Sequence, residues 1–291
     1  MNNEYIITSD NNCDLPRDFL SENGVELCYL SFTMDNETYD GVEKILDDHV
    51  FYDKMRGGQM PTTAQVNPSQ LVEMFKKHLD EGKDILHIAF SSNLSGTYNN
   101  AIIAKEELEK DYQQRKIIVI DSLAASLGQG MLIFSAVNLK KQGKTIDEVA
   151  NWVEENKLHA CHFFTVSDLN HLYRGGRVSK TAAFLGTLIH IKPILYVDNE
   201  GRLIPSIKVK GRKKSIETLV QKMKQNIGDY ENDTIFISHG DCAEDIEYLK
   251  QLINKEFGEK NFVINFVSPT IGAHSGPDTI ALFFYGNSRI I

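Results

Sequence analysis

The chain has 291 residues, of which 42% are hydrophobic, and it carries a formal net charge of −9 at pH 7. This length suffices for about two domains, and the apolar share suffices for a sizeable core. The acidic balance argues against nucleic-acid coating as the main role, so we expect no nucleic-acid partner. The sequence shows no charged-then-apolar leader and no apolar stretch long enough to span a bilayer, so we expect a soluble, cytoplasmic protein.

Strand and helix signals alternate over the first half of the chain. Short apolar runs predict buried strands at residues 5–8, 85–90 and 116–120. Helices are predicted from about residue 15, from 67–68, over 97–112, through 131–137 and from 145. Asp14 is the expected N-cap of the first helix, and Thr145 with Glu148 has capping-box spacing. This order predicts a three-layer α/β arrangement, in which helices cover a parallel sheet.

The pattern changes near residue 160. Strand-like runs occupy 160–166, 234–238, 262–267 and 280–285, and two more flank a hairpin turn at 198–201. Hairpins together with helices predict an α+β domain with a mixed sheet. We therefore expect an N-terminal α/β domain at residues 1–158 and a C-terminal α+β domain at residues 159–291. No Pro- or Gly-rich linker separates them, so the two domains should pack closely.

Several signatures of catalysis and metal binding are missing. The four cysteines lie far apart and form no C-x-x-C pair, so reduced thiols are expected. No H-E-x-x-H motif or cluster of acids with His points to a metal site, and His159 and His162 are interpreted as structural. The absence of G-x-S-x-G counts against serine-hydrolase chemistry, and the absence of a P-loop counts against independent use of ATP.

The turn at residues 91–97 joins a predicted strand to a predicted helix and is rich in hydroxyl groups. Its hydroxyl-bearing residues are Ser91, Ser92, Ser95 and Thr97. Free backbone N–H groups at a helix start, together with hydroxyls, suit an anion, and Gly96 lets a ligand approach the backbone. Simple helix capping is the competing interpretation, although it needs only one of these residues.

Two further loops offer neutral hydrogen-bonding groups. Thr62 and Thr63 precede the helix at 67–68, and His274 lies among small residues at 271–277. An ordinary polar loop and a tight turn with an exposed His are the competing interpretations. Three such clusters without an evident base–nucleophile pair suit holding an anion better than transforming it.

Basic residues gather in two places. Arg174 and Arg177 flank a Gly-Gly pair that precedes a predicted apolar helix at 181–186. Between residues 202 and 214 there are six basic residues and no acidic one: Arg202, Lys208, Lys210, Arg212, Lys213 and Lys214. Such a patch could dock an acidic partner or a ligand head group, whereas solvated hairpin charges are the competing interpretation.

Taken together, these motifs resemble those of the DegV family of bacterial fatty-acid-binding proteins. The resemblance covers nearly the whole chain and lies in seven segments, in order: 8–16, 61–65, 91–98, 120–130, 172–195, 211–214 and 272–277. The segment 172–195 is the most specific of them. Two departures, Ala64 where many relatives have Ser and Val66 where many have Pro, alter the loop that carries Thr62 and Thr63.

The resemblance implies a DegV-like fold with a long-chain fatty acid, such as palmitate, bound between the two domains and with no cofactor. The carboxylate would meet Thr62 and Thr63, the turn that carries Ser91, Ser92, Ser95 and Gly96, and His274. Thr63 and Ser95 are expected to lie closest to it. Hydroxyl and amide donors can hold an ionised carboxylate without a buried counter-charge.

The resemblance also implies a carrier that is not itself an enzyme and that presents the carboxylate to a separate fatty acid kinase, which forms an acyl-phosphate. Expected contacts to the kinase or the head group are Arg202, Arg174, Arg177, Lys210 and Arg212. Exchange of the ligand with a membrane would require transient contact and opening. Two alternatives stay open: an enzyme acting on acyl esters or phosphates, for instance through His274 and Ser95, and a regulatory protein that senses lipid at the same site.

Overall fold

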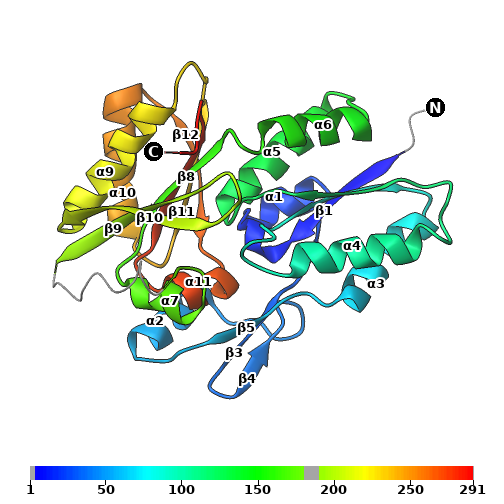
Figure 1. The fold of residues 1–291 in the computed structure, drawn as a ribbon, viewed down its shortest axis with the longest axis horizontal. Coiled ribbons are helices and arrows are strands. Elements are labelled where there is room, and N and C mark those ends of the chain that lie inside the picture. The colour runs from blue at the N-terminus through cyan, green and yellow to red at the C-terminus, as the bar shows by residue number, and fades with distance from the viewer. Residues whose placement is uncertain (1–3, 180–189, 291) are drawn as a thin grey trace.

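The computed structural model describes residues 4–179 and 190–290 of the chain (Figure 1). Its first sheet is parallel, with the strand order β2-β1-β6-β7. The strands are β1 (Tyr5–Asp10), β2 (Glu26–Cys28), β6 (Asp84–Ala89) and β7 (Ile117–Asp121). Every residue of β1 and β6 is buried, as expected for central strands of a sheet that is covered on both faces.

Helices pack on both faces of this sheet. One face is covered by α3 (Pro68–Asp80) and α4 (Thr97–Leu108), and the other by α1 (Arg17–Glu22), α5 (Leu127–Lys141) and α6 (Ile146–Asn156). Capping boxes start α3 at Asn67 with Gln70 and α6 at Thr145 with Glu148. The second of these confirms the prediction from sequence, because the side chain and backbone of each pair bond reciprocally.

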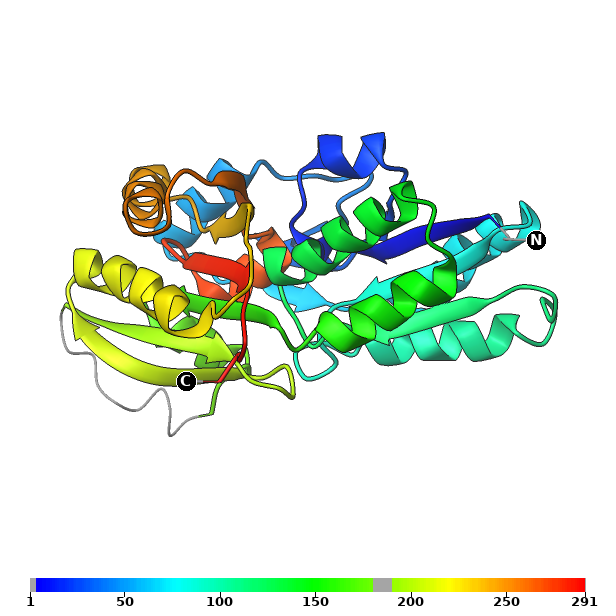
Figure 2. The same cartoon turned by 90° about the horizontal axis from the view of Figure 1, so that it is seen from above.

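The second sheet has six strands in the order β10-β9-β8-β13-β11-β12. It is mixed: β11 and β12 are parallel, and the other neighbours are antiparallel. The strands are β8 (Ala160–Thr165), β9 (Ile191–Val197), β10 (Leu203–Lys210), β11 (Thr234–His239), β12 (Asn261–Phe266) and β13 (Ile280–Tyr285). Its outer face is covered by α9 (Arg212–Asn226) and α10 (Ala243–Phe257), and its inner face packs against α5. Figure 2 shows the two sheets toward opposite ends of an elongated molecule.

A small lobe was not predicted from the sequence. It consists of a three-stranded sheet in the order β4-β3-β5 and the helix α2 (Asp48–Arg56). The strands are β3 (Ser31–Met34), β4 (Glu37–Tyr39) and β5 (Thr62–Ala64). The lobe shares a hydrophobic cluster with α11 (Pro269–Ser275), which lies beside α7 (Leu169–Arg174). A short 3₁₀ turn, η1 (Asn11–Cys13), follows β1.

The fold class predicted from sequence is confirmed: an α/β fold with a parallel four-stranded sheet and a separate mixed sheet. The division of the chain at residue 158 stays a prediction. The apolar helix predicted at 181–186, and Lys180 before it, lie outside the described residues. Within residues 4–179 and 190–290, every helix is too short or too polar to cross a lipid bilayer.

Two local predictions were wrong. Asp14 does not cap α1, because α1 begins only at Arg17 and Asp14 has a left-handed backbone with φ 53°. The helix predicted over 97–112 already ends at Leu108. The competing interpretation of 271–277 as a tight turn does not hold, because the segment belongs mainly to helix α11, in which Pro269 occupies the first helical position, where proline is favoured.

Candidate functional site

A cavity of about 410 Å³ lies between the two large sheets. On one side it is bounded by segments that follow the carboxyl ends of the parallel strands: Asn12 after β1, Leu30 after β2, Phe90 after β6 and Ala125 after β7. In open α/β sheets, ligands bind in crevices at this edge. The volume also lies within the range of small-molecule sites. The cavity is therefore the leading candidate for a ligand site.

The opposite wall of the cavity is the inner face of the mixed sheet, and it is largely apolar. Phe164 pairs with Ala281, and His162 pairs with Phe283, across β8 and β13. Because strand side chains alternate between faces, these four project into the same layer. Further apolar lining comes from Leu94, Leu172, Val197, Leu203, Val267 and Ile271. Such a wall suits a hydrocarbon chain, which is driven out of water into apolar surroundings.

One end of the cavity carries neutral hydrogen-bonding groups from three separate segments. Thr63 on β5 lies with its Oγ1 2.9 Å from Nε2 of His274 on α11. Ser95 lies in the turn before α4, with its Oγ 3.0 Å from Oγ1 of Thr97. Thr63, Ser95, Gly96 and His274 all line the cavity. The structure therefore brings together four of the seven residues that were predicted to meet a carboxylate.

The turn before α4 and the strand β5 are held against each other by Gly96. A side chain at this position would place its Cβ 2.2 Å from Oε1 of Gln65, so any larger residue would displace the Gln65 side chain. Gly96 itself supplies no side-chain cap to α4, but the N–H of Thr97, the first residue of the helix, donates to the Ser95 hydroxyl over 3.3 Å. Ser95 and Gly96, which directly precede α4, therefore line the same cavity as Thr63.

His274 is neutral at physiological pH. Burial, together with the positive charges of Arg177 and Arg174, lowers the pKa of its imidazole to about 4. Its ring lies against Gly175, where a Cβ would come within 2.1 Å of Nδ1. A neutral imidazole that contacts a threonine hydroxyl can donate or accept one hydrogen bond at each nitrogen. It therefore offers polarity at this end of the cavity without a fixed charge.

Three predicted carboxylate contacts do not line the cavity. Thr62 is exposed and lies on the opposite side of β5 from Thr63. Ser91 is buried, and its hydroxyl donates to the carbonyl of Gly201 over 2.9 Å. The backbone N–H of Ser92 donates to the Asp121 carboxylate over 3.2 Å. Ser91 and Ser92 therefore shape the turn, while Ser95 faces the cavity.

Of the basic residues predicted as partner or head-group contacts, Arg177 alone contributes to the lining of this cavity, as far as the described residues show. Its guanidinium donates to the Leu94 carbonyl over 3.0 Å and 3.2 Å, and burial lowers its pKa. It therefore holds the turn that carries Ser95.

The other basic residues lie outside the cavity. Arg174 is exposed and contacts His171, and Lys210 lies exposed at the end of β10. Arg202 pairs with Asp198 and Glu200, and Arg212 pairs with Asp245. These carboxylates partly neutralise the basic run between residues 202 and 214.

A buried polar network at the wall of the cavity was not predicted from the sequence. The Asp14 carboxylate accepts hydrogen bonds from the Ser126 hydroxyl and from the backbone N–H of Ser268, and the Ser126 hydroxyl also lies 2.7 Å from that of Ser238. Asn12 accepts a hydrogen bond from Thr270 close by. Burial raises the pKa of Asp14 to about 8 despite these bonds. The network joins segments near β1, β7, β11 and β12, which are distant in the sequence.

Metal ligation finds no support in the described parts of the chain, 4–179 and 190–290, where no group of three or more His, Cys, Asp or Glu side chains is arranged to hold an ion. The cavity combines an apolar wall with a neutral polar end. This combination places the chain among proteins with an enclosed small-molecule cavity whose lining suits an amphiphile.

Comparison with known proteins gives the family. Residues 5–287 match the family model described as "Uncharacterised protein, DegV family", and the chain belongs to the DegV family. A DegV domain-containing protein of Clostridium perfringens is 44% identical over 287 residues, covering 98% of this chain and 99% of that protein. A DegV domain-containing protein of Streptococcus pyogenes is 35% identical over 288 residues, covering 98% and 99%.

Solved structures of similar fold carry names that mention fatty acids. A structure described as "Fatty Acid Binding of a DegV family Protein from Thermus thermophilus" has a TM-score of 0.88 at 27% identity, covering 97% of this chain and 99% of that one. The structure of "DegV, a fatty acid binding protein from Bacillus subtilis" has a TM-score of 0.84 at 26% identity, covering 98% and 100%. Fatty-acid binding is therefore a described property of structural relatives in this family.

Proposed function

We propose that the protein binds a long-chain fatty acid in the cavity between its two large sheets and presents the carboxylate to a fatty acid kinase. The observation that carries the proposal is that one cavity combines a largely apolar wall with a cluster of hydroxyl and imidazole groups. An apolar wall formed by β8, β9, β10 and β13 leads to one end where Thr63, Ser95 and His274 offer neutral hydrogen-bonding groups. The binding of fatty acids by structural relatives supports the same ligand here.

The polar end suits an ionised carboxylate. Hydrogen bonds to a charged acceptor are about twice as strong as neutral ones, and the two hydroxyls of Thr63 and Ser95 can both donate to carboxylate oxygens. The N-terminal end of α4, which begins at Thr97, adds the favourable partial positive charge of a helix start. Arg177 lies nearby but is bound to the Leu94 carbonyl, so it contributes long-range attraction without a direct ion pair.

The apolar wall supplies most of the binding free energy. Each methylene group that leaves water contributes about 0.8 kcal/mol. A palmitoyl chain has about fourteen such groups, so complete burial would contribute roughly 11 kcal/mol before the entropic terms that oppose association. The head-group contacts then determine the orientation of the ligand and its selectivity for a free acid.

Presentation to a kinase is supported by the position of the hairpin β9–β10. The carbonyl of Gly201 in its turn accepts from Ser91, and the carbonyl of Glu200 accepts from the Asn93 side chain over 2.6 Å. Arg202 follows directly and is exposed. A partner that docks on Arg202 would therefore lie next to the turn that holds the carboxylate, which suits phosphoryl transfer to the head group by a cytoplasmic kinase.

The proposal is tested by binding and turnover together. Purified protein should bind palmitate with one site per chain and should support acyl-phosphate formation when a fatty acid kinase and ATP are added. No turnover is expected from the protein and ATP alone. Failure to bind palmitate would refute the carrier function, while binding without any kinase turnover would refute presentation.

A second candidate function, hydrolysis of acyl esters, has one specific observation in its favour. Ser126 lies between β7 and α5 with φ 56° and ψ −146°, within the sequence Ala124–Gly128, which has the small-x-Ser-x-Gly spacing of a nucleophile elbow. Its hydroxyl contacts Asp14, the one candidate base in this network. With its pKa raised to about 8, however, Asp14 is mostly protonated at neutral pH and is a poor proton acceptor there.

The two functions are separable by experiment. A hydrolase would release acid from p-nitrophenyl palmitate through an acyl-Ser126 intermediate, and a fluorophosphonate probe would label wild type but not the Ser126→Ala variant. Absence of both label and turnover in the wild type would remove this candidate and leave the carrier.

A further inference from the structure

Helix α2 is bonded to the chain on both sides of α11, the helix that carries His274. Before α11, the hydroxyl of Tyr52 donates to the Val267 carbonyl over 2.7 Å. After α11, the guanidinium of Arg56 donates to the Asp278 carboxylate over 3.0 Å. Tyr52 and Arg56 lie one helical turn apart on α2. Helix α2 is therefore bonded to the chain directly before and directly after α11, and these two bonds hold α11 in place.

Between these two bonds the helices pack with almost no space between them. Gly272 on α11 lies so close to α2 that a Cβ would come within 2.6 Å of the Tyr52 hydroxyl and 3.0 Å of Phe51. Phe51 and Tyr52 are fully buried, and they share a hydrophobic cluster with Ala273. Because a closely packed contact transmits displacement, a shift of α2 would shift α11.

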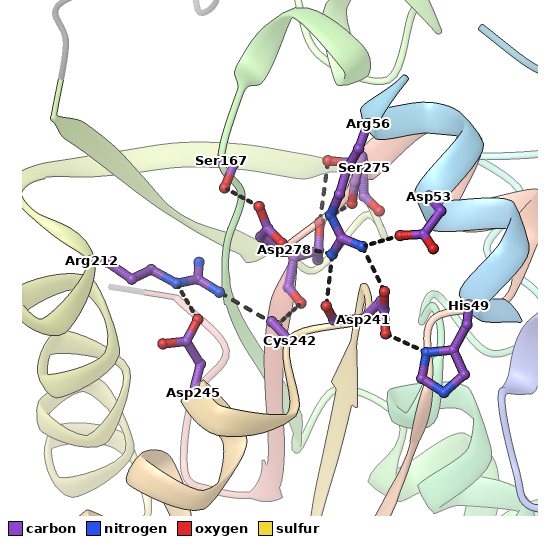
Figure 3. Close-up of polar contacts among 12 residues, drawn as sticks. His49, Asp53, Arg56, Ser167, Arg212, Asp241, Cys242, Asp245, Ser275 and Asp278 are labelled. Atoms are coloured by element: carbon purple, nitrogen blue, oxygen red, sulfur yellow. Dashed lines mark hydrogen bonds and ion pairs between the residues drawn. The ribbon is translucent and has the colours of Figure 1, made fainter. Parts of the chain in front are cut away.

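Arg56 is the centre of an ionic cluster that joins the lobe to the mixed-sheet side of the molecule (Figure 3). Besides Asp278, it donates to the Asp241 carboxylate over 2.6 Å, to the Asp241 carbonyl over 2.7 Å and to Asp53 over 3.2 Å. His49, one turn before Asp53 on α2, adds a contact of 2.7 Å to Asp241. Partial burial alone would raise the pKa of Asp241, but the bonds from Arg56 and His49 outweigh it and keep the pKa below its usual range.

Backbone hydrogen bonds hold together the two loops whose carboxylates, Asp241 and Asp278, accept hydrogen bonds from Arg56. The N–H of Asp278 donates to the Gly240 carbonyl over 2.7 Å, and the N–H of Gly240 donates to the Thr279 carbonyl over 2.8 Å. Asp241 and Asp278 are also both in the left-handed region, at φ 63° and 59°. The loop after β11 and the loop after α11 therefore form one preformed acceptor for the guanidinium.

From these contacts we propose that Tyr52 and Arg56 form a clamp that positions α11, so that His274 stays beside Thr63 and the bound fatty acid is retained. Arg56 and Tyr52 are positioning residues, because neither lines the cavity. The inference rests on the proposed fatty-acid binding. It states that two residues of α2, which do not contact the ligand, slow the dissociation of the ligand.

A matched control lies on the same helix. Lys54 pairs with Asp35 over 2.5 Å, but this ion pair stays within the lobe and does not reach α11 or the loops beside it. Leu71 on α3 supplies a second control, because it is fully buried in a different hydrophobic cluster and does not line the cavity. Lys54→Ala removes an ion pair from α2, and Leu71→Ala destabilises the protein without touching the clamp.

The experiment compares dissociation of labelled palmitate from wild type and from Arg56→Ala, Arg56→Lys and Asp278→Asn, together with the nitrogen NMR signals of the His274 imidazole. Asparagine at 278 tolerates the left-handed backbone, so this variant removes the charge and keeps the turn. Lysine at 56 keeps the charge but offers one ammonium nitrogen in place of the two guanidinium nitrogens that share these acceptors.

We expect dissociation to be roughly tenfold faster in Arg56→Ala and Asp278→Asn, as for loss of a charged hydrogen bond, with an intermediate value for Arg56→Lys. The His274 signals should move in these three variants, while Lys54→Ala and Leu71→Ala match the wild type in both measurements. Wild-type dissociation and unchanged His274 signals in Arg56→Ala and Asp278→Asn would overturn the clamp. If the wild type itself fails to bind palmitate, the proposed function fails, and the His274 signals still decide whether the clamp exists.

Discussion

Replacing Thr63 with valine tests the polar end of the cavity with little change of shape. Valine keeps the β-branched form that suits strand β5 but replaces the hydroxyl that lies 2.9 Å from His274. A hydrogen bond to a charged acceptor contributes about 1.5–3 kcal/mol, so palmitate affinity should fall roughly 10- to 150-fold. Isothermal titration calorimetry at neutral pH would measure this loss.

The same strand offers a matched control for this experiment. Thr62→Val makes the identical chemical change one residue earlier, at an exposed position on the other side of β5, and should leave palmitate affinity unchanged. Methyl palmitate, which lacks the charge, should lose much less affinity than palmitate does in Thr63→Val. An equal loss for both ligands, or no loss for either, would refute the assignment of Thr63 to the carboxylate.

Three further predictions concern stability, partner contact and ligand size. Because burial raises the Asp14 pKa to about 8, the folded chain keeps a proton that the unfolded chain loses near pH 4. The free energy of unfolding should therefore fall by up to about 1.4 kcal/mol for each unit by which the pH rises from 4 to 8. Urea titrations should show a flatter pH profile for Asp14→Asn, and identical profiles would contradict the burial argument. Arg202→Glu should leave palmitate binding intact and reduce acyl-phosphate formation with the kinase, and unchanged turnover would remove the exposed Arg202 from the partner surface. Ala281→Phe should fill space beside Phe164 and weaken palmitate more than octanoate in competition binding, whereas equal weakening would place the acyl chain elsewhere.

Sequence patterns predicted the main strands and helices because these elements follow from patterns among residues that are close in the sequence. Buried strands such as β1 and β6 are continuous apolar runs, and the capping box at Thr145 marks the start of α6 from two side chains. The lobe formed by β3, β4, β5 and α2 was not predicted, because its strands have three or four residues and little apolar periodicity. Such short segments are stabilised mainly by tertiary contacts, here those with α11.

The candidate site was predicted only in part, because tertiary contacts also determine which of its side chains face the cavity. Hydroxyl-rich turns can be seen in the sequence, but which hydroxyl faces the cavity depends on tertiary contacts. Ser91 turns away because the Gly201 carbonyl accepts its hydroxyl, and that contact joins residues 110 positions apart. The apolar wall from Phe164 and Phe283 could not be assigned, because strand alternation gives two faces without saying which one the ligand meets.

Asp14 shows how a correct residue type can be given the wrong role. An acidic residue shortly before a predicted helix is typical of an N-cap. In the folded chain the carboxylate instead accepts from Ser126 and from Ser268, 112 and 254 positions away. Nothing local to Asp14 could have indicated either partner.

The most direct test of the central claim is native mass spectrometry of the purified protein, followed by denaturation and identification of any released lipid. The cavity predicts a mass increment equal to one long-chain fatty acid per chain, lost on denaturation and much reduced in Thr63→Val. A protein that carries no lipid, and that takes up none when palmitate or longer acids are added, would contradict fatty-acid binding as its function.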